Sequence, residues 1–396
     1  MPISGGLRQT WHGVSSRDHT RTVAAGTEPG FLSQILSIRK AGPVFEVRPF
    51  EGSAVDLSDF ITGVWRGAYA GKMAFPLWTP EYFEWQFDFS SGVSREQILA
   101  AYDGGRVVGA LLGLPFLFRT PTGIEIGLFS SWLSVDAGYR GRGIVGALKS
   151  EQARSFHDRG GTLIFAYRYV GSRHSLSKRP TDPELASGEW SIRRVGFWVR
   201  ILDPRRAAKW SPDRLTRIAT TLGAPFTLTP RTRASDSFIR PYEPRDLAAC
   251  VEVVRRHNAS KTFAIDWDEH QLAKHCEGGG VGRCLVAERN GEVRGFVTFH
   301  ILPFQGLTVA PVGVFDIVNV GRISGREQRR LLTVVLATMR EQGAIVALKL
   351  RTGDAPLASM LATGFVPWSR DSWEAVRRLD EGPVISLRGA QSVLWR

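Results

Sequence analysis

The chain of 396 residues carries 51 lysine and arginine residues against 38 aspartate and glutamate residues, a net charge of +13. Its length exceeds that of an ordinary single domain, and an apolar fraction of 43% argues against a disordered chain, so two folded cores are expected. The positive charge indicates an anionic partner, which can be a phosphate-bearing cofactor, an acidic carrier protein, a nucleic acid or a membrane surface.

Cysteine usage and hydropathy narrow the setting. Three cysteines without C-x-x-C spacing predict a reducing compartment, the cytoplasm. No apolar run reaches the roughly 18 residues of a membrane span, so no membrane partner is expected, and residues 1–43 are predicted to be a flexible tail. His270, His275 and Cys276 do not share one helical face, and no metal site is predicted.

The first folded unit is predicted to start with an alternating strand at Val44 and an amphipathic helical segment near Trp78. Residues 101–116, AYDGGRVVGALLGLPF, predict a short strand, a Gly-Gly turn and a long apolar strand. A strand at 128–135, a helix over 144–159 and a strand at 162–167 follow. A further helix is expected to end at Gly196-Phe197.

A second copy of this pattern lies 186 residues further along the chain. Residues 287–304, AERNGEVRGFVTFHILPF, repeat the alanine, glycine, valine and glycine of residues 101, 105, 107 and 109. A helical segment near Trp267 and a closing Gly364-Phe365 complete the copy. The repeat predicts a tandem of two α/β domains.

The predicted boundaries follow from composition. The first domain spans 44–202 and the second 238–380. Residues 203–237 form a basic linker rich in proline and arginine, with a short helix at 212–221, and residues 381–396 form a C-terminal strand or tail.

The sharpest motif lies between the strand at 128–135 and the following helix, where Arg140-Gly141-Arg142-Gly143 fills the turn. Glycines let the backbone approach a ligand, and the first turn of a helix offers unpaired N–H groups at its positive end, which suits a diphosphate. The alternative is that the glycines serve only the turn. The dinucleotide fingerprint and the Walker loop are both excluded by spacing.

The run Val135-x4-Arg140-Gly141-Arg142-Gly143-Ile144 resembles the acyl-CoA-binding signature of the GNAT superfamily of N-acetyltransferases. The resemblance implies an α/β (α+β) fold of two tandem GNAT-like domains, each a mixed, mostly antiparallel sheet flanked by helices, with acetyl-CoA or another acyl-CoA as co-substrate. It further implies that Leu133, Ser134 and Val135 pair with pantetheine and that the pyrophosphate is held by Arg140, Gly141, Arg142, Gly143, Ile144, Val145 and Gly146. Val145 departs from the Gly or Ala of the family pattern.

Catalytic residues are less clearly marked. GNAT relatives often protonate the leaving thiolate with a tyrosine four residues before the closing Gly-Phe, but here Ile192 and, in the second copy, Met360 hold that position. Tyr169 and His174 are therefore the first candidates for acid or base, and Glu125 is a further candidate base. Each of them can instead have a structural role.

Two further residues are candidates for substrate contacts. Trp132 is a candidate for the acyl pocket. Asp316, on the corresponding strand of the second copy, is expected either to bind a cationic acceptor amine or to be a satisfied core polar group.

The second copy reads VNVGRISGREQRR where the first carries its motif, so it is expected to have lost the CoA site and to complete the acceptor pocket or to be purely structural. The predicted function is acyl-CoA-dependent N-acylation of a small-molecule amine. Residues 193–245 hold 12 basic and 4 acidic residues, which keeps an acyl carrier protein or aminoacyl-tRNA donor as an alternative. A non-catalytic acyl-CoA or metabolite sensor is the third possibility.

Overall fold

The computed structural model describes residues 45–91, 95–169, 189–223, 238–387 and 390, which belong to one compact unit. The first half contains β1 (Glu46–Pro49), α2 (Ala54–Tyr69), β2 (Phe75–Pro76), α3 (Pro80–Phe87), β3 (Ile98–Asp103), β4 (Arg106–Thr120), β5 (Gly123–Val135), α4 (Ile144–His157), β6 (Leu163–Tyr169) and β7 (Ser191–Ile201). Two helices, α6 (Pro204–Trp210) and α7 (Arg214–Gly223), lead out of it. The second half contains β8 (Ile239–Pro241), α8 (Leu247–Asn258), β9 (Ala264–Ile265), α9 (Glu269–Glu277), β10 (Gly282–Arg289), β11 (Glu292–Gln305), β12 (Val309–Asn319), α10 (Gly325–Glu341), β13 (Val346–Leu350), α11 (Leu357–Ala362) and β14 (Val366–Arg378).

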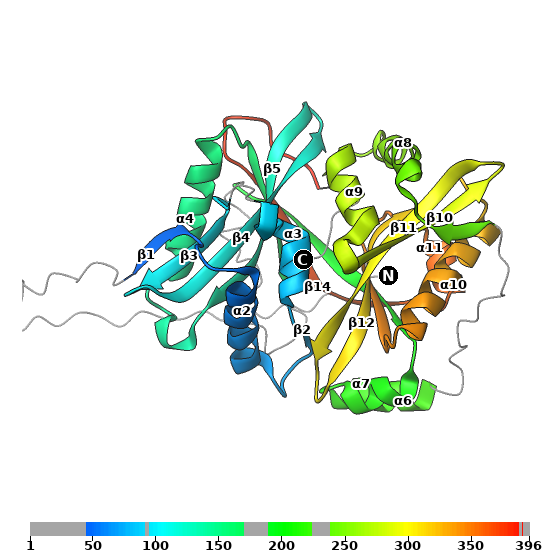
Figure 1. Cartoon of the computed structure of the whole chain (residues 1–396), viewed down its shortest axis with the longest axis horizontal. Helices are drawn as coiled ribbons and strands as arrows, with labels where there is room; N and C mark the ends of the chain where they lie inside the picture. Colours follow the sequence, from blue (N-terminus) through cyan, green and yellow to red (C-terminus); the bar gives the residue numbers. More distant parts are fainter. Residues whose placement is uncertain (1–44, 92–94, 170–188, 224–237, 388–389, 391–396) are drawn as a thin grey trace, which may run out of the picture. The chain divides into compact units, whose positions relative to one another are not determined.

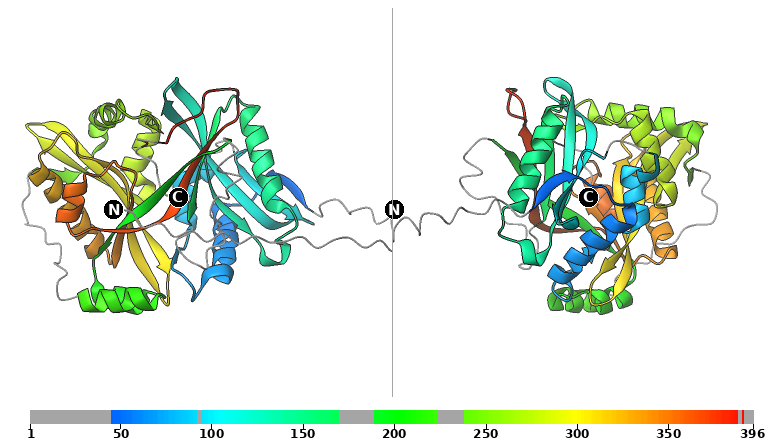
Figure 2. Two further views of the ribbon diagram at one scale, coloured as in Figure 1. Left: turned by 180° about the vertical axis from the view of Figure 1, so that it is seen from behind. Right: turned by 60° about the vertical axis from the view of Figure 1, so that its left-hand side comes forward.

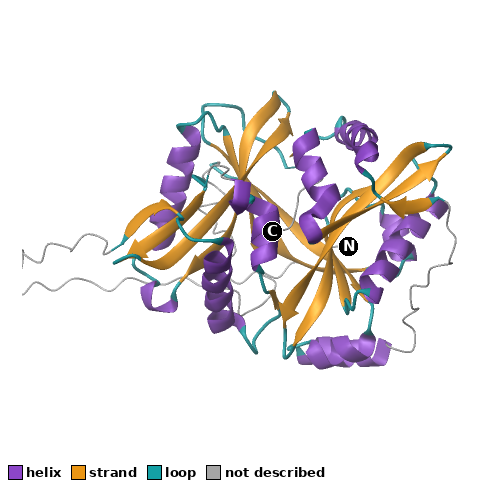
Figure 3. Cartoon of the chain, viewed as in Figure 1, coloured by secondary structure: helices purple, strands orange, loops and turns teal. Residues whose placement is uncertain are grey.

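One mixed sheet runs through both halves, with helices packed against its faces (Figure 1, Figure 3). Its strand order is β1-β3-β4-β5-β6-β14-β7-β13-β12-β11-β10-β8, and β2 and β9 pair at the side with β11 and β4. The order reads as two equivalent sets of six strands that meet between β14 and β7. The fold class expected from the sequence, α/β with two similar halves, is confirmed.

Each half gives its last strand to the other half. β14, from the end of the second half, lies between β6 and β7 and pairs antiparallel with both. β7, from the end of the first half, pairs on its other side with β13 of the second half. Figure 2 shows the two strands crossing the centre of the molecule side by side. The sheet is therefore continuous through strands that the sequence places far apart.

The repeated hairpins have the same geometry in both halves. The pairing register of β3 and β4 shifts after Ala101, which faces Gly109. The register of β10 and β11 shifts in the same way after Ala287, which faces Gly295. Both glycines sit at close approaches: a Cβ on Gly109 would lie 2.7 Å from Ile144 of α4, and one on Gly295 would lie 2.8 Å from a backbone oxygen. The repeated glycines thus mark the points where each hairpin is tightly packed.

The core joins the two halves on one face of the sheet. A single cluster of buried apolar side chains contains residues of α2, α3 and β4–β6 together with residues of α8, α9 and β10–β12. α4 packs on β3–β5 in a separate cluster, and α10 and α11 cover another cluster of the second half. The helices that carry the sequence motif and its degenerate copy therefore lie on the side of the sheet opposite the shared core.

One local prediction is wrong, and the structure adds detail to two others. Gly196-Phe197 lies inside strand β7 instead of following a helix, and Ile192 is on the same strand, opposite Ala375. The linker begins with two helices, α6 and α7, and residues 224–237 lie outside the described part. Residues 384–387 form no strand, although Ile385 and Leu387 are buried in the core.

Within the described residues, no helix is long and apolar enough to cross a membrane.

Candidate functional site

The turn between β5 and α4 presents backbone to solvent. Gly141 and Gly143 adopt φ of 78° and 87°, the left-handed region that glycine enters without a steric penalty. Gly143 is the N-cap of α4, and no side chain caps the helix there. The first N–H groups of α4 are therefore open to a ligand, at the end of the helix where the dipole favours an anion.

Two arginines stand at this turn. Arg142 stacks on the ring of Tyr139 at 4.7 Å, and Arg140 donates from Nε to the backbone oxygen of Val135 at 3.3 Å. Both arginine side chains remain exposed, and the hydroxyl of Tyr139 is tied to Asp103 at 2.5 Å. The turn thus combines open amides with two positioned cations, as diphosphate binding requires. The predicted strand, turn and helix are confirmed, with α4 starting at Ile144.

β5 and β6 stop pairing before β5 reaches the turn, and we call the unpaired region between the two strands the gap. The two strands pair in parallel from Gly127 to Ser130 only. Beyond Ser130, the register of β5 against β4 shifts, and Trp132 takes a φ of 54° that side-chain-bearing residues rarely adopt. Leu133 is partly exposed on the far side of this bulge, while the hydroxyl of Ser134 is buried and accepts from Trp65 at 2.9 Å. The backbone edge of β5 at Leu133 to Val135 faces the gap, where a ligand strand could pair.

The remaining residues of the predicted set divide into packing and exposed positions. Ile144 is buried against β3 and β4, and Val135 is nearly so. Val145 and Gly146 are exposed on the first turn of α4, beside the open amides. The structure therefore brings the predicted set together around one turn, with the buried members fixing its position.

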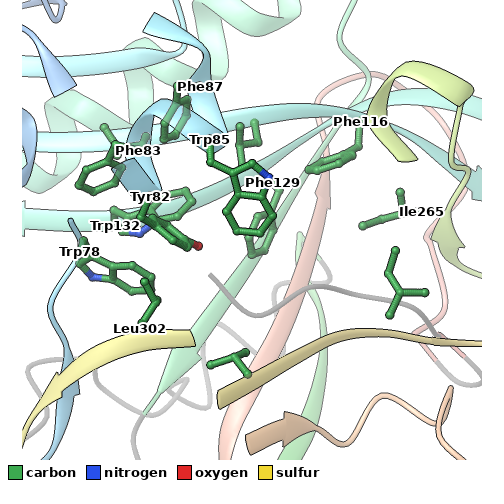
Figure 4. Close-up of a cluster of buried hydrophobic side chains, with 14 of the residues drawn as sticks. Trp78, Tyr82, Phe83, Trp85, Phe87, Phe116, Phe129, Trp132, Ile265 and Leu302 are labelled. Carbon is green, nitrogen blue, oxygen red and sulfur yellow. The ribbon is translucent and has the colours of Figure 1, made fainter. Parts of the chain in front are cut away.

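Trp132 fills the space on the core side of the bulge. Its ring is 3% exposed and makes edge contacts with Trp78, Tyr82, Phe83 and Phe87 at centroid distances of 5.5–6.3 Å. Figure 4 shows these rings packed around it, all of them from the segment that contains α3. Its indole N–H is buried and has no hydrogen-bond partner among the described residues.

The equivalent turn of the second half is closed by its own side chains. Ser324 caps α10 by accepting from the N–H of Glu327, and the Glu327 carboxylate accepts from the N–H of Ser324 at 2.8 Å. This capping box satisfies the N–H groups of Ser324 and Glu327, and it places a negative charge where the start of α4 has two arginines and no acidic residue.

The gap beside β12 is also filled. Asp354 enters it and accepts from the Val318 N–H, Thr352 and Lys349, at 3.4, 2.9 and 2.8 Å. Lys349 and Asp354 are almost completely buried. Among the described residues of the second half, side chains therefore occupy both the helix start and the gap.

Glu125 lies at the opposite end of β5 from the turn. It accepts two hydrogen bonds from Arg378, at 2.8 and 3.1 Å, and others from Thr120, Thr122 and Thr162. Burial would raise its pKa, but these donors outweigh burial and lower the pKa to about 2. The carboxylate is thus held ionised in an ion pair away from the gap. The proposed reaction does not use Glu125 as its base.

The other candidates are placed as follows. Tyr169 is the last residue of β6, opposite Ser372 of β14, and its side chain is not described. His174 lies outside the described residues. Asp316 stands on β12 as expected, but it is buried and accepts from His300 Nδ1 at 2.7 Å, deep in the shared core beside Tyr82.

Five buried aspartate, glutamate, lysine or histidine residues among the described ones were not singled out from the sequence: Asp246, His300, Lys349, Asp354 and Glu374. The only local signal is a charged residue inside an apolar strand, as in VALKL and SWEAV. Such a signal does not say which partner the charge meets, because that partner comes from a distant strand.

Comparisons with known proteins support the resemblance of the first half to GNAT acetyltransferases. Residues 58–170 match the family model described as an acetyltransferase (GNAT) domain. Comparison with curated proteins gives no match.

Solved structures extend the similarity in fold to nearly the whole chain. Saccharomyces cerevisiae N-myristoyltransferase with bound myristoyl-CoA aligns with a TM-score of 0.69 at 13% identity, over 89% of this chain and 90% of that one. Two further structures of the Saccharomyces cerevisiae enzyme, one with myristoyl-CoA and inhibitors and one with myristoyl-CoA, give TM-scores of 0.63 and 0.64 at 14% identity. They cover 85% of this chain and 80% and 78% of theirs. Residues 58–170 are therefore similar to a GNAT acetyltransferase domain, and the chain as a whole has the two-part fold of N-myristoyltransferase.

Proposed function

We propose that the protein is an acyl-CoA-dependent N-acyltransferase that acts on a small-molecule amine, with its CoA site in the first half only. The observation that carries this proposal is the contrast between the two helix starts. α4 begins at an uncapped Gly143 beside two exposed arginines, whereas α10 begins at a capping box with an acidic residue in its first turn. Open amides next to arginines suit the pyrophosphate of CoA, and closed amides next to a carboxylate do not.

The proposed site extends from the turn between β5 and α4 to the gap between β5 and β6. The amides from Arg140 to Gly146 hold the pyrophosphate, and the free edge of β5 at Leu133 to Val135 pairs with pantetheine. The thioester then lies in the gap between β5 and β6. The amine attacks the carbonyl carbon there, and a positioned acid protonates the leaving thiolate. Tyr169 and His174 remain our candidates for that acid.

We propose that the acyl group is short, with acetyl as the first candidate. The space on the core side of the bulge is filled by Trp132 and the aromatic rings of α3, so a long chain would have to displace large buried side chains. Nothing comparable limits an acetyl group. In this proposal, the packing around Trp132 limits the length of the acyl chain. The similarity in fold to N-myristoyltransferase does not determine that length.

The deciding measurement is calorimetric titration of the full chain with acetyl-CoA and with longer acyl-CoAs. We expect binding that Arg140→Ala and Arg142→Ala each weaken by about tenfold, because each removes one charged contact to phosphate. Arg326→Ala, in the corresponding first turn of α10, is the matched control and should leave the affinity unchanged. No binding of any acyl-CoA would overturn the proposal.

The choice of donor and acceptor is tested by turnover. Free thiol released from acetyl-CoA in the presence of primary amines would support the N-acyltransferase. Transfer that requires charged tRNA or acyl carrier protein, and that is lost steeply with salt, would replace CoA as the donor. Tight CoA binding without turnover across the amine panel would support a sensor instead.

A further inference from the structure

Glu374 is a buried carboxylate at the point where the two halves exchange strands. It lies on β14, opposite Tyr167 of β6 on one side and opposite Arg193 of β7 on the other. Its side chain is completely buried. Although β14 belongs in sequence to the second half, the exchange places this residue next to the strand that borders the gap of the first half.

The two oxygens of Glu374 have different surroundings. Oε2 accepts from Arg193 Nε and Nη2 at 2.9 and 2.5 Å. Oε1 is buried and has no hydrogen-bond partner among the residues that the structure describes. A buried carboxylate oxygen without a donor is costly, and a structural ion pair alone would not need to leave it so. The open oxygen therefore points to a donor that is absent here, such as an amine.

The position of Glu374 fits such a donor. Tyr167 is the first residue of β6 beyond its pairing with β5, so Glu374 stands level with the opening of the gap. Neighbouring strands are about 4.8 Å apart, which places a thioester held between β5 and β6 within one to two strand spacings of β14.

Glu374 also lies on the side from which an acceptor would approach. Tyr167, its cross-strand neighbour, packs on the shared core and donates to Ser372 at 2.6 Å. α4 packs in a separate cluster on the other side of the sheet. A donor anchored at α4 and an amine beside Glu374 would thus meet across the gap.

We propose that Glu374 is the proton acceptor for the amine in the acyl transfer proposed above, on which this inference rests. The amine nitrogen forms a bond to the thioester carbonyl carbon, and its excess proton passes to Glu374 Oε1. The carbon–sulfur bond then breaks, and its electron pair stays on sulfur. The thiolate takes up one proton, so the products are an amide and the free thiol of CoA.

The surroundings of Glu374 suit this role. Burial raises its pKa, and Arg193 and Lys349 oppose that effect while Asp354 adds to it. Tyr167 and Arg193 are the polar neighbours on the two adjoining strands. A carboxylate with a raised pKa is a stronger base than an exposed one and is still ionised when its pKa lies below the working pH.

The test compares the full-length protein with Glu374→Gln, which keeps the shape of the side chain and an oxygen for Arg193. Thiol release from acetyl-CoA is followed with spermidine, glucosamine and lysine as acceptors. We expect kcat to fall by about 10²- to 10⁴-fold, with the calorimetric affinity for acetyl-CoA unchanged. The fall of kcat/KM on the acid side of the pH profile should disappear in the variant.

Glu189→Gln is the matched control, since Glu189 is an exposed glutamate that pairs with Arg377 at 2.9 Å; it should retain wild-type kcat. If Glu374→Gln does not fold, Glu374→Asp replaces it. This variant should have a lower kcat and should keep the fall of kcat/KM on the acid side of the pH profile.

Wild-type kcat in either folded variant would overturn the assignment of Glu374 and leave the proposed function standing. Failure of the wild-type protein to bind acetyl-CoA would overturn the proposed function itself. Binding without thiol release from any of the three amines would overturn both catalytic proposals.

Discussion

At the residue scale, the site depends on backbone conformations that only particular residues allow. Gly141 and Gly143 hold positive φ in a turn where a Cβ would meet nothing, so the constraint on them is conformational and not spatial. Trp132 accepts a positive φ a few residues earlier, at a point fixed by four aromatic neighbours. Strain of this kind is kept where packing enforces it, and here it lies beside the gap.

Gly143→Ala should weaken the proposed CoA site. A residue with a Cβ in the left-handed region costs about 1–2 kcal/mol, so the turn would relax toward another conformation and its amides would turn away. We expect acetyl-CoA affinity to fall by about tenfold in calorimetry. Gly325→Ala, in the first turn of α10 where a Cβ would meet nothing, should bind acetyl-CoA as the wild-type protein does. Equal affinity in both variants would show that the conformation of Gly143 is not needed.

Glu125 should stabilise the protein in a pH-dependent manner. Its pKa is lowered from 4.5 to about 2 in the folded state, so the stabilisation is complete above pH 4.5 and is lost as the pH falls toward 2. We expect Glu125→Gln to lower the free energy of unfolding at pH 7 by on the order of 2 kcal/mol, allowing for partial screening. The difference from wild type should shrink in urea melts between pH 5 and 2. Glu46→Gln, an exposed control, should show little difference.

At the element scale, the two halves contain equivalent strands, turns and helices, but side chains surround these elements differently. Both have a bulged strand followed by a turn and a helix, and both have a gap beyond the parallel pairing of two strands. In the second half, Asp354 closes the gap and the capping box closes the helix start. The second half thus has polar side chains of its own at the two places that are open in the first half.

Asp354→Ala should strongly destabilise the second half. It leaves the Lys349 ammonium buried without its carboxylate, which costs about 3–5 kcal/mol. Adding Lys349→Met removes the stranded charge, so the double variant should recover much of the lost stability in urea unfolding. Asp59→Ala, an exposed position on α2, should change the free energy of unfolding by less than about 0.5 kcal/mol. A double variant no more stable than Asp354→Ala would contradict this account of the pair.

At the scale of the whole molecule, the strand exchange makes the halves depend on each other. Without β14, the edge of β6 opposite β5 has no neighbour, and without β13, β7 has an open edge. α3 and α9 are joined as well, because Trp85 donates to the Lys274 backbone oxygen and Lys274 donates to the Gln86 oxygen, both at 2.9 Å. The predicted boundaries at 202 and 238 therefore describe the repeat in sequence, and we propose that neither half is an independent folding unit.

Splitting the chain tests this dependence. Residues 45–223 and 238–396, produced together, should form a complex that binds acetyl-CoA, since these two segments contain the described strands of the shared sheet. Residues 45–223 produced alone should aggregate, because unpaired strand edges associate with other chains. Size exclusion chromatography and circular dichroism distinguish the outcomes. A monomeric, cooperatively folded 45–223 fragment would show that the first half stands alone.

The sequence by itself determined the elements whose signals are local. Hydrophobic alternation and turn residues marked the hairpins, the repeat marked the two halves, and Arg140 to Gly143 marked the turn before α4, because each depends on neighbours within a few residues. The helix predicted to end at Gly196-Phe197 failed for the opposite reason: pairing with β13 and β14 holds that segment as a strand.

Only the tertiary structure decided which polar side chains meet. It tied Glu125 to Arg378, placed Asp316 against His300, and set Glu374 next to β6, the strand that borders the gap of the other half. All three cysteines are likewise free and buried in the second half. These contacts join residues up to 253 positions apart, and their energies depend on burial and geometry that no local pattern of residues records.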